Sequence, residues 1–419
     1  MRPITTANIL AIGTELLTPY RTDTNSLYLT ARLNELGIDV SAKRVIGDDV
    51  GDLERALAQA LQQTDLVITS GGLGPTSDDV TREAVSSVLG LPMAEDPALV
   101  ELLRERFARR GTSMPEINRR QAMVPHGAVV LPNSRGSAPG LLIAQGEKLV
   151  LLLPGPPREL EPMFESSVRD RLAERTSGRR LRRRVVKIAG QPESKVDEIA
   201  APVYEPWARL PQPISTTILA SPGQVELHVS ARGTDVAALD AQLAAAVTAL
   251  CAALGDSVFS TDGRALEVVV GDALRGRGLT LAVAESCTGG LVAGRLTDVP
   301  GSSACVVGGV VAYANDVKRD LLDVPADVLA RHGAVSEPVA AAMAVGVRRA
   351  LHADVGVAVT GIAGPDGGTA EKPVGTVCFS VAGPGDQLTT VTRMVPGDRG
   401  LIRQWSVLVA LDLVRRALL

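Results

Sequence analysis

The sequence predicts an α/β protein in which two larger α/β parts flank a small α+β module. Short apolar runs of strand type alternate with amphipathic helical segments in the first and last thirds of the chain, as in parallel sheets covered by helices. Several of these runs end in glycine-rich or polar clusters, which is where open α/β sheets bind ligands. A length of 419 residues exceeds one ordinary core, so two or three domains are expected.

The first part, residues 1–170, alternates strand-like and helix-like segments and ends its first helix at Gly37. Its third and fourth strands run into the glycine- and proline-rich loops 70–79 and 154–159. This alternation predicts a parallel sheet with flanking helices. The expected strands are 8–12, 40–45, 66–69 and 149–153, and the expected helices are 25–37, 52–61 and 80–89.

The middle part, residues 171–258, differs in composition and begins with the basic run 179–187. Its β-α-β-β-α order suggests a KH-like fold, with helices at 194–201 and 236–254 and strands at 215–220 and 225–231. KH domains clamp nucleic-acid backbone with a GXXG loop, but the first strand–helix turn here is Gly190-Gln191-Pro192-Glu193. We therefore expect a linking and dimerising domain, which favours a homodimer and makes nucleic-acid binding unlikely.

In the last part, residues 259–419, the alternating pattern returns. The expected strands are one directly before Ser286, 305–313, 355–360 and 376–382, and the expected helices are 266–275, one directly after Gly290, 317–322, 338–351 and 401–418. The helices and the first strands again predict an α/β sheet.

The composition of the chain argues against several classes of protein. A net charge of −4 disfavours a protein that coats nucleic acid or an anionic membrane. The four cysteines form no CxxC pair, so neither a zinc ribbon nor a disulfide framework is expected, and a reducing cytoplasm fits. The N-terminal apolar run resembles a strand rather than a signal peptide. The most apolar run, near 304–312, holds about nine residues, far short of a membrane span.

Three strands of the last part end in polar clusters, at Ser286, at 313–318 and at 360–365. If these strands are parallel neighbours, the clusters meet at one edge of the sheet. Asn315 is expected to cap the next helix, which places Lys318 in its first turn. There the helix dipole favours the neutral amine. Lys318 is thus a candidate base, and Tyr313 a candidate proton relay. The alternative is that Lys318 is a solvated surface lysine.

Two neighbouring residues, Ser286 and Cys287, are candidate nucleophiles, and spacing alone does not choose between them. Cysteine is intrinsically more reactive, but a small cysteine beside Gly289 and Gly290 is often a packing residue. Thr360 and the glycines after it offer a hydroxyl and N–H groups for an oxyanion or a phosphate. The alternative for that loop is a plain glycine-rich turn.

The glycine-rich loop 71–79 follows a strand and opens a helix, so it is suited to a phosphate. Asp78 and Asp79 would repel a phosphate unless a divalent cation lies between them. A phosphate-plus-metal site is therefore expected, with Glu15 and Asp23 as further ligands. The alternative is that both aspartates only cap the helix after the loop.

The C-terminal part resembles that of the CinA proteins in four blocks: AESCTGG (284–290), AYANDVK (312–318), TGIAGPDGGTAEKPVGTV (360–377) and GDR (397–399). The resemblance implies hydrolysis of the carboxamide of nicotinamide mononucleotide to nicotinate mononucleotide and ammonia, without a cofactor. It implies Ser286 as the nucleophile, acting with Lys318, Tyr313 and Thr360. The substrate contacts expected at this site are Gly289, Gly290, Asn315, Gly361, Gly364 and either Arg399 or Arg403.

The first part resembles the N-terminal part of the same family in GTELL (13–17), TSGGLGPTSDDVTREA (69–84), NRRQAMVP (118–125) and LPGPPRE (153–159). This implies a molybdopterin-binding-protein-like fold and hydrolysis of ADP-ribose to AMP and ribose 5-phosphate with a divalent cation of the Mg, Mn or Co type. The substrate contacts expected here are Thr14, Asn25, Gly71, Gly72 and Gly74. The chain departs from the family pattern at TPYRTDTN (18–25). Two alternatives are a competence-associated nucleic-acid-binding factor and a molybdopterin-binding protein without hydrolase activity in this half.

Overall fold

The computed structural model describes residues 2–385 and 387–419, which form two compact units. One unit ends at Arg182 and also takes in Arg232–Leu239; the other comprises Arg183–Ala231 and Asp240–Leu419. The predicted mixed α/β class is confirmed. The division at residues 170 and 258 stays a prediction, because the second unit contains both the sheet of the middle part and the sheet of the last part.

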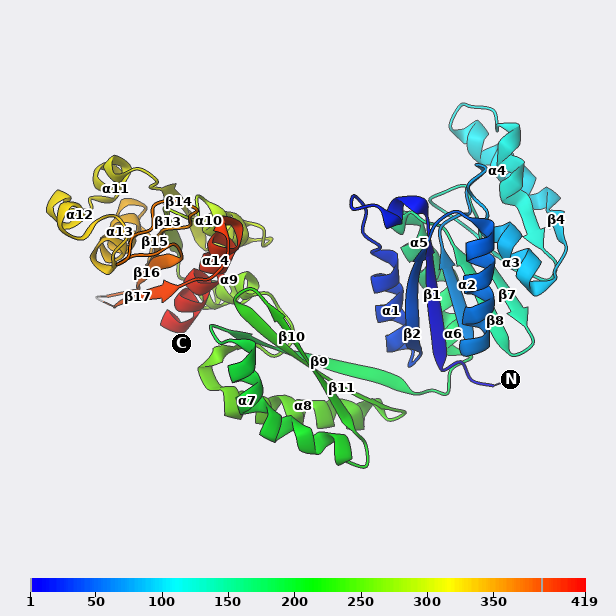
Figure 1. Ribbon diagram of the computed structural model, residues 1–419, viewed down its shortest axis with the longest axis horizontal. Coiled ribbons are helices and arrows are strands. Elements are labelled where there is room, and N and C mark those ends of the chain that lie inside the picture. Colours follow the sequence, from blue (N-terminus) through cyan, green and yellow to red (C-terminus); the bar gives the residue numbers. More distant parts are fainter. Residues whose placement is uncertain (1, 386) are drawn as a thin grey trace. The chain divides into compact units, whose positions relative to one another are not determined.

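The first unit is built on a six-stranded sheet with the order β2-β1-β3-β8-β7-β6 (Figure 1). Neighbours from β2 to β8 are parallel, whereas β7 and β6 are antiparallel. The last two strands were not expected from the sequence. The strands are β1 (Thr6–Ile12), β2 (Asp39–Ile46), β3 (Leu66–Ser70), β6 (Val129–Leu131), β7 (Gly140–Gln145) and β8 (Lys148–Leu153).

Helices cover both faces of this sheet because each presents one apolar stripe to it. Leu29 and Leu160 belong to the buried cluster on one face, and Leu53 and Val85 to the cluster on the other. The helices are α1 (Asn25–Glu35), α2 (Val50–Gln63), α3 (Thr81–Leu89), α5 (Pro157–Met163) and α6 (Arg169–Ala173). A small two-stranded sheet, β4 (Met93–Glu95) with β5 (Met123–Pro125), accompanies α4 (Pro97–Arg109).

The middle part forms a four-stranded sheet with the order β10-β11-β9-β12. Its strands are β9 (Arg180–Ala189), β10 (Ile214–Ser221), β11 (Gln224–Gly233) and β12 (Val258–Ser260), and its helices are α7 (Glu193–Tyr204) and α8 (Val236–Leu254). This gives the expected strand and helix order, followed by the short β12.

Helix α8 is the most apolar helix of the middle part. The segment Val236–Ser257 has 22 residues and a mean hydropathy of 1.7, so by length and composition alone it could cross a membrane. Leu239, Leu243 and Leu250 on it are fully buried, and 22% of the apolar window is buried in all. The apolar run at 304–312 is therefore not the longest candidate for a span.

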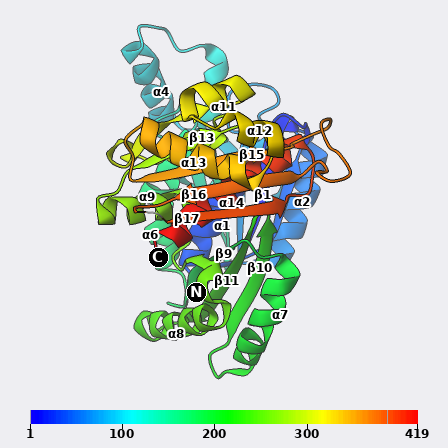
Figure 2. The same cartoon turned by 90° about the vertical axis from the view of Figure 1, so that its left-hand side faces the viewer.

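The last part is a five-stranded sheet with the order β14-β13-β15-β16-β17. Figure 2 labels β13, β15, β16 and β17 of this sheet. β13 lies between β14 and β15 and is parallel to both, whereas β16 and β17 are antiparallel. The strands are β13 (Leu281–Glu285), β14 (Val306–Val311), β15 (Val355–Gly361), β16 (Thr376–Ala382) and β17 (Leu388–Met394). The helices are α9 (Leu266–Arg277), α10 (Leu291–Thr297), α11 (Asn315–Leu322), α12 (Ala326–His332), α13 (Glu337–Ala350) and α14 (Arg399–Ala417).

Candidate functional site

The three polar clusters of the last part meet at one edge of its sheet, as the sequence predicts. In the parallel register Glu285 lies opposite Val311 on one side and Val359 on the other. Glu285 and Val311 are the last residues of β13 and β14, whereas β15 continues to Gly361. Ser286 is held at this edge because its N–H donates to the Val359 carbonyl at 2.9 Å.

Lys318 is buried, with 1% of its surface exposed, and its amine reaches Ser286. Its Nζ donates to Ser286 Oγ at 3.0 Å and to the carbonyls of Ala312 at 2.6 Å and Tyr313 at 3.1 Å. The reading of Lys318 as a solvated surface residue is therefore wrong. The N-cap of α11 is Ala314, so Asn315 is the first helical residue rather than the expected cap.

Burial decides the protonation chemistry at this point. It lowers the pKa of Lys318, against a smaller opposing effect of the Cys287 thiol. Burial also raises the pKa of Cys287 to about 12, so this thiol stays protonated near neutral pH. Burial therefore favours the neutral form of the amine that contacts the Ser286 hydroxyl, while the neighbouring thiol lacks thiolate character. The geometry therefore favours Ser286 over Cys287 as the nucleophile.

Tyr313 and Thr360 are near the site, but their hydroxyl groups are engaged elsewhere. The Tyr313 hydroxyl accepts from Arg399 Nη2 at 3.2 Å, and only its backbone carbonyl contacts Lys318. The Thr360 hydroxyl is buried and donates to the Ala334 carbonyl at 2.8 Å. The proposed phenol relay to Lys318 is thus not formed, and Thr360 does not offer its hydroxyl proton to an oxyanion.

The two candidate arginines of α14 do different things. Arg403 is half-buried and donates from Nε to the Cys287 carbonyl at 3.1 Å and from Nη2 to the Thr288 carbonyl at 2.9 Å, so it holds the turn after Ser286. Arg399 is exposed and donates to the Gly364 carbonyl at 2.9 Å. Of the two, Arg399 is the more exposed.

Glu285 has a role that the sequence did not reveal. Its buried carboxylate accepts from the N–H groups of Gly290 and Val292, both at 3.0 Å, and from that of Ala293 at 2.8 Å. These are N–H groups at the start of α10, where a helix favours negative charge. The N–H of Gly290 is therefore not free to hold a phosphate, and Glu285 fixes the turn that carries Ser286.

Replacing Glu285 by glutamine is expected to destabilise the protein by about 1–3 kcal/mol, because buried N–H groups lose a charged acceptor. Thermal and urea unfolding would measure the change. The exposed Glu371→Gln is a matched control that should unfold like the parent protein. Equal unfolding of the Glu285 and Glu371 variants would show that this carboxylate does not hold α10.

In the first unit, the predicted glycine loop lines a pocket of about 350 Å³. Gly71 has φ +109° and a Cβ there would lie 2.2 Å from the Ile12 carbonyl oxygen, and Gly72 has φ +65° with Thr81 Oγ1 at 2.1 Å. Only glycine fits at both positions. The acidic residues that line this pocket are Glu15, Asp48, Asp78, Asp79 and Glu159.

Asp79 holds the loop rather than capping the helix. It accepts from the N–H of Gly74 at 2.7 Å and from the N–H of Thr76 at 2.9 Å. The N-cap of α3 is Val80, without a side-chain hydrogen bond, so the idea that both aspartates cap the helix is wrong. Sequence reasoning also missed Arg82, a buried guanidinium that donates to the carbonyls of Leu73 at 2.7 Å and Gly74 at 2.9 Å.

The expected set of metal ligands is not assembled as predicted. Asp23 accepts from the Ser26 N–H at 2.9 Å and does not line the pocket, unlike Glu15, Asp78 and Asp79. Within residues 2–385 and 387–419, no three His, Cys, Asp or Glu side chains converge to hold a metal ion. A protein-only metal site with these four ligands is therefore not supported.

Thr14 and Asn25, the other predicted contacts, shape the walls of this pocket. The Thr14 N–H donates to the Asp48 carboxylate at 2.9 Å, and Asp48 lines the pocket. Asn25 Nδ2 donates to Ser70 Oγ at 2.8 Å and to the Gly155 carbonyl at 2.7 Å. Asn25 thus ties the ends of two strands together beside the glycine loop.

Comparison with known proteins gives matches over both units. Residues 263–418 match the family described as "CinA C-terminal domain", and residues 8–174 match "Probable molybdopterin binding domain". A "CinA-like protein" of Koribacter versatilis (strain Ellin345) is 48% identical over 424 residues, covering 99% of this chain and 100% of the relative. A "Putative competence-damage inducible protein" of Symbiobacterium thermophilum is 48% identical over 432 residues, 99% of each chain.

Among solved structures, the competence/damage inducible protein CihA from Agrobacterium tumefaciens is 42% identical, with a TM-score of 0.36, and the match covers 36% of this chain and 93% of that one. The full-length relatives decide the family, because their identity extends over both the glycine-loop half and the Ser286 half. The chain belongs to the CinA family, with a molybdopterin-binding-like N-terminal domain and a CinA C-terminal domain.

Proposed function

We propose that the C-terminal domain hydrolyses the carboxamide of nicotinamide mononucleotide to nicotinate mononucleotide and ammonia. The observation that carries this proposal is the 3.0 Å contact between Lys318 Nζ and Ser286 Oγ at a buried sheet edge. A serine becomes a nucleophile when a positioned base takes its proton. Lys318 can do so because burial lowers its pKa and because two carbonyls accept its other N–H groups.

The reaction is acyl transfer in two stages. Ser286 Oγ attacks the carboxamide carbon as its proton passes to Lys318. The lysine then gives this proton to the amide nitrogen, the C–N bond breaks, ammonia leaves and an ester remains on Ser286. Water, deprotonated by the same amine, releases nicotinate mononucleotide and restores the serine. N–H groups at the start of the turn after Ser286 bind the oxyanion, since the N–H of Gly290 already donates to Glu285. Arg399 binds the substrate phosphate.

For the N-terminal domain, the proposed reaction is hydrolysis of ADP-ribose to AMP and ribose 5-phosphate. The supporting observation is a pocket that joins a glycine loop to five acidic side chains. The glycines let backbone approach a diphosphate, and the acidic groups require a cation beside it. A divalent ion there would be shared between Glu15 or Asp78 and the substrate phosphates, as Mg²⁺ commonly is. When bound, it would neutralise charge on the diphosphate.

Asp78→Asn is expected to lower AMP formation from ADP-ribose by about 100-fold, because a carboxylate facing the cation is lost. EDTA should abolish the same activity. Chromatographic analysis of AMP, with and without metal, is the measurement. The variant Asp79→Asn serves as the comparison, because Asp79 holds the loop and its loss should also lower the unfolding temperature. AMP formation undiminished in EDTA would exclude the metal-assisted reaction.

A further inference from the structure

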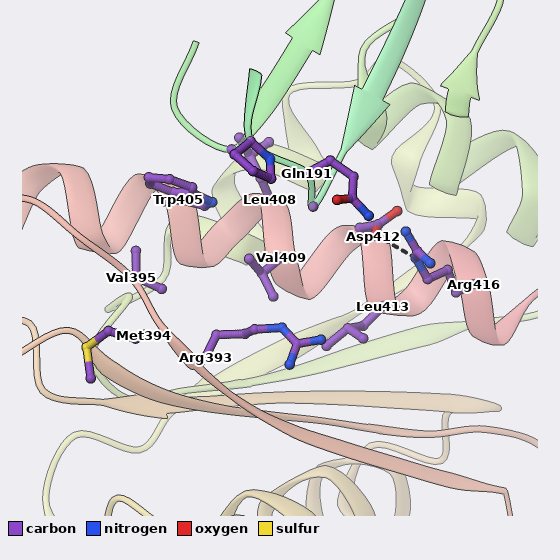
Figure 3. A pocket seen from close by; sticks show the side chains of 13 residues that line it. Gln191, Arg393, Met394, Val395, Trp405, Leu408, Val409, Asp412, Leu413 and Arg416 are labelled. Atoms are coloured by element: carbon purple, nitrogen blue, oxygen red, sulfur yellow. Dashed lines mark hydrogen bonds and ion pairs between the residues drawn. The ribbon is translucent and has the colours of Figure 1, made fainter. Parts of the chain in front are cut away.

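A second pocket in the unit that contains the Ser286 site lies along α14. It has a volume of about 380 Å³, within the range of small-molecule sites. Its walls come from the β9–α7 turn, the tip of the β10–β11 hairpin, the end of β17 and one face of α14. None of the residues assigned above to either reaction lines it, so the proposed activities leave it unexplained (Figure 3).

The two ends of this pocket differ in chemistry. Trp405 and Val395 lie toward one end, whereas the guanidinium groups of Arg393 and Arg416 lie toward the other, with Val409 between them (Figure 3). The chain has only two tryptophans among 419 residues and 2% aromatic residues in all. A tryptophan at one end of a cavity offers a flat face to a planar ring.

The cationic end carries excess positive charge. Arg416 donates from Nε to Asp412 Oδ2 at 2.7 Å, but Asp412 also pairs with the buried Arg415, so one carboxylate serves two guanidinium groups. Arg393 is exposed, and its Nη1 donates to a backbone carbonyl, that of Thr392 at 3.3 Å. A guanidinium in this situation is suited to a phosphate, which it can bind through two parallel N–H groups.

Two glycines let the neighbouring loops close on α14. Gly223 has φ +78°, and a Cβ there would lie 2.8 Å from Trp405 Cδ1, so the hairpin backbone packs directly against the indole. Gly190 has φ +72°, and its Cβ position is 3.7 Å from Asp412 Oδ2. The tryptophan is thus held from one side by the hairpin, and the β9–α7 turn lies beside Asp412 and Arg416.

We propose that this pocket is a binding site for a nucleoside monophosphate, with the base against Trp405 and the phosphate at Arg393 and Arg416. An aromatic end and a cationic end in one cavity suit a ligand that has a planar ring at one end and an anion at the other. A free phosphate would use only the arginines, and a nucleoside without phosphate would use only the apolar end.

Trp405 provides a local reporter once Trp207→Phe has removed the other indole. AMP is the probe, because it carries both chemical groups and has no carboxamide to react at Ser286. Titration with AMP should quench Trp405 fluorescence to saturation. Adenosine and inorganic phosphate, titrated separately, should each bind at least about tenfold more weakly, since each makes only part of the contacts.

In the Trp207→Phe background, Arg393→Gln should weaken AMP binding by about tenfold or more, through loss of a charge-assisted contact. Arg331→Gln removes an exposed arginine on α12 and is the matched control, with unchanged binding expected. Circular dichroism and the unfolding temperature check that both variants fold. Saturable quenching that Arg393→Gln leaves unchanged, binding of adenosine as tight as that of AMP, or no quenching at millimolar AMP would each overturn the proposal.

Discussion

Replacing Ser286 by alanine is expected to lower ammonia release from nicotinamide mononucleotide by at least about 10⁴-fold, because no other group supplies the attacking oxygen. The unfolding temperature should change little, since the hydroxyl is small and its loss leaves the turn bonded through Glu285 and Arg403. Ammonia release under saturating substrate, with nicotinate mononucleotide identified by chromatography, is the measurement.

The neighbouring cysteine gives the matched control for this prediction. Cys287→Ala should keep activity within a few-fold of the parent. The cysteine is 6% exposed, and burial raises the pKa of its thiol so that it stays protonated. If the cysteine variant loses activity while Ser286→Ala retains it, the nucleophile assignment is wrong. If both variants are fully active, the reaction does not take place at this edge of the sheet.

The sequence predicted the convergence of Ser286 with Lys318 because it depends on local rules. Apolar runs mark the strands, polar residues mark their ends, and parallel neighbours bring those ends to one edge. The sequence did not predict the burial of Lys318. The helix dipole was the expected cause of a lowered pKa, whereas the structure gives burial as the largest cause.

Other features of the Ser286 site depend on contacts between residues far apart in the sequence. Arg403 reaches the Cys287 carbonyl across 116 positions. The Thr360 hydroxyl donates to the Ala334 carbonyl across 26 positions. The sequence could not show this contact, so Thr360 was expected to be an oxyanion donor. No periodicity signals such pairings. Glu285 could have been found locally, because an acid followed by a glycine pair and a helix start is a recognisable capping arrangement.

The N-terminal half shows why residue type does not distinguish a ligand from a scaffold. Asp79 and Asp23 were both expected to bind a metal, yet Asp79 accepts N–H groups of its own loop and Asp23 accepts the N–H of Ser26 at the start of α1. The buried Arg82 also supports the loop, and it was hidden among helix residues. The antiparallel strands β6 and β7 escaped prediction because they are short or weakly alternating.

The pH dependence of the amidase should report Lys318 directly. The base must be neutral, and burial holds its pKa below the ordinary value of 10.5. As pH falls below that depressed pKa, the amine becomes protonated and kcat/KM should fall tenfold per pH unit. As pH rises through it, kcat/KM should approach a plateau, with a midpoint below pH 10.5. Initial rates in a series of buffers at constant ionic strength measure this profile.

Two substitutions of Lys318 distinguish the loss of a base from a change in the shape of the site. Lys318→Gln should lower kcat/KM by about 10²- to 10⁴-fold, which is the range for loss of a general base. Lys318→Arg keeps a long donor side chain but cannot give up its proton, so it should be equally inactive. An active arginine variant, or a parent profile that still rises steeply at pH 10.5, would show that Lys318 is not the base. The residual activity of the glutamine variant should lose the acid limb, because the group that titrates there is gone.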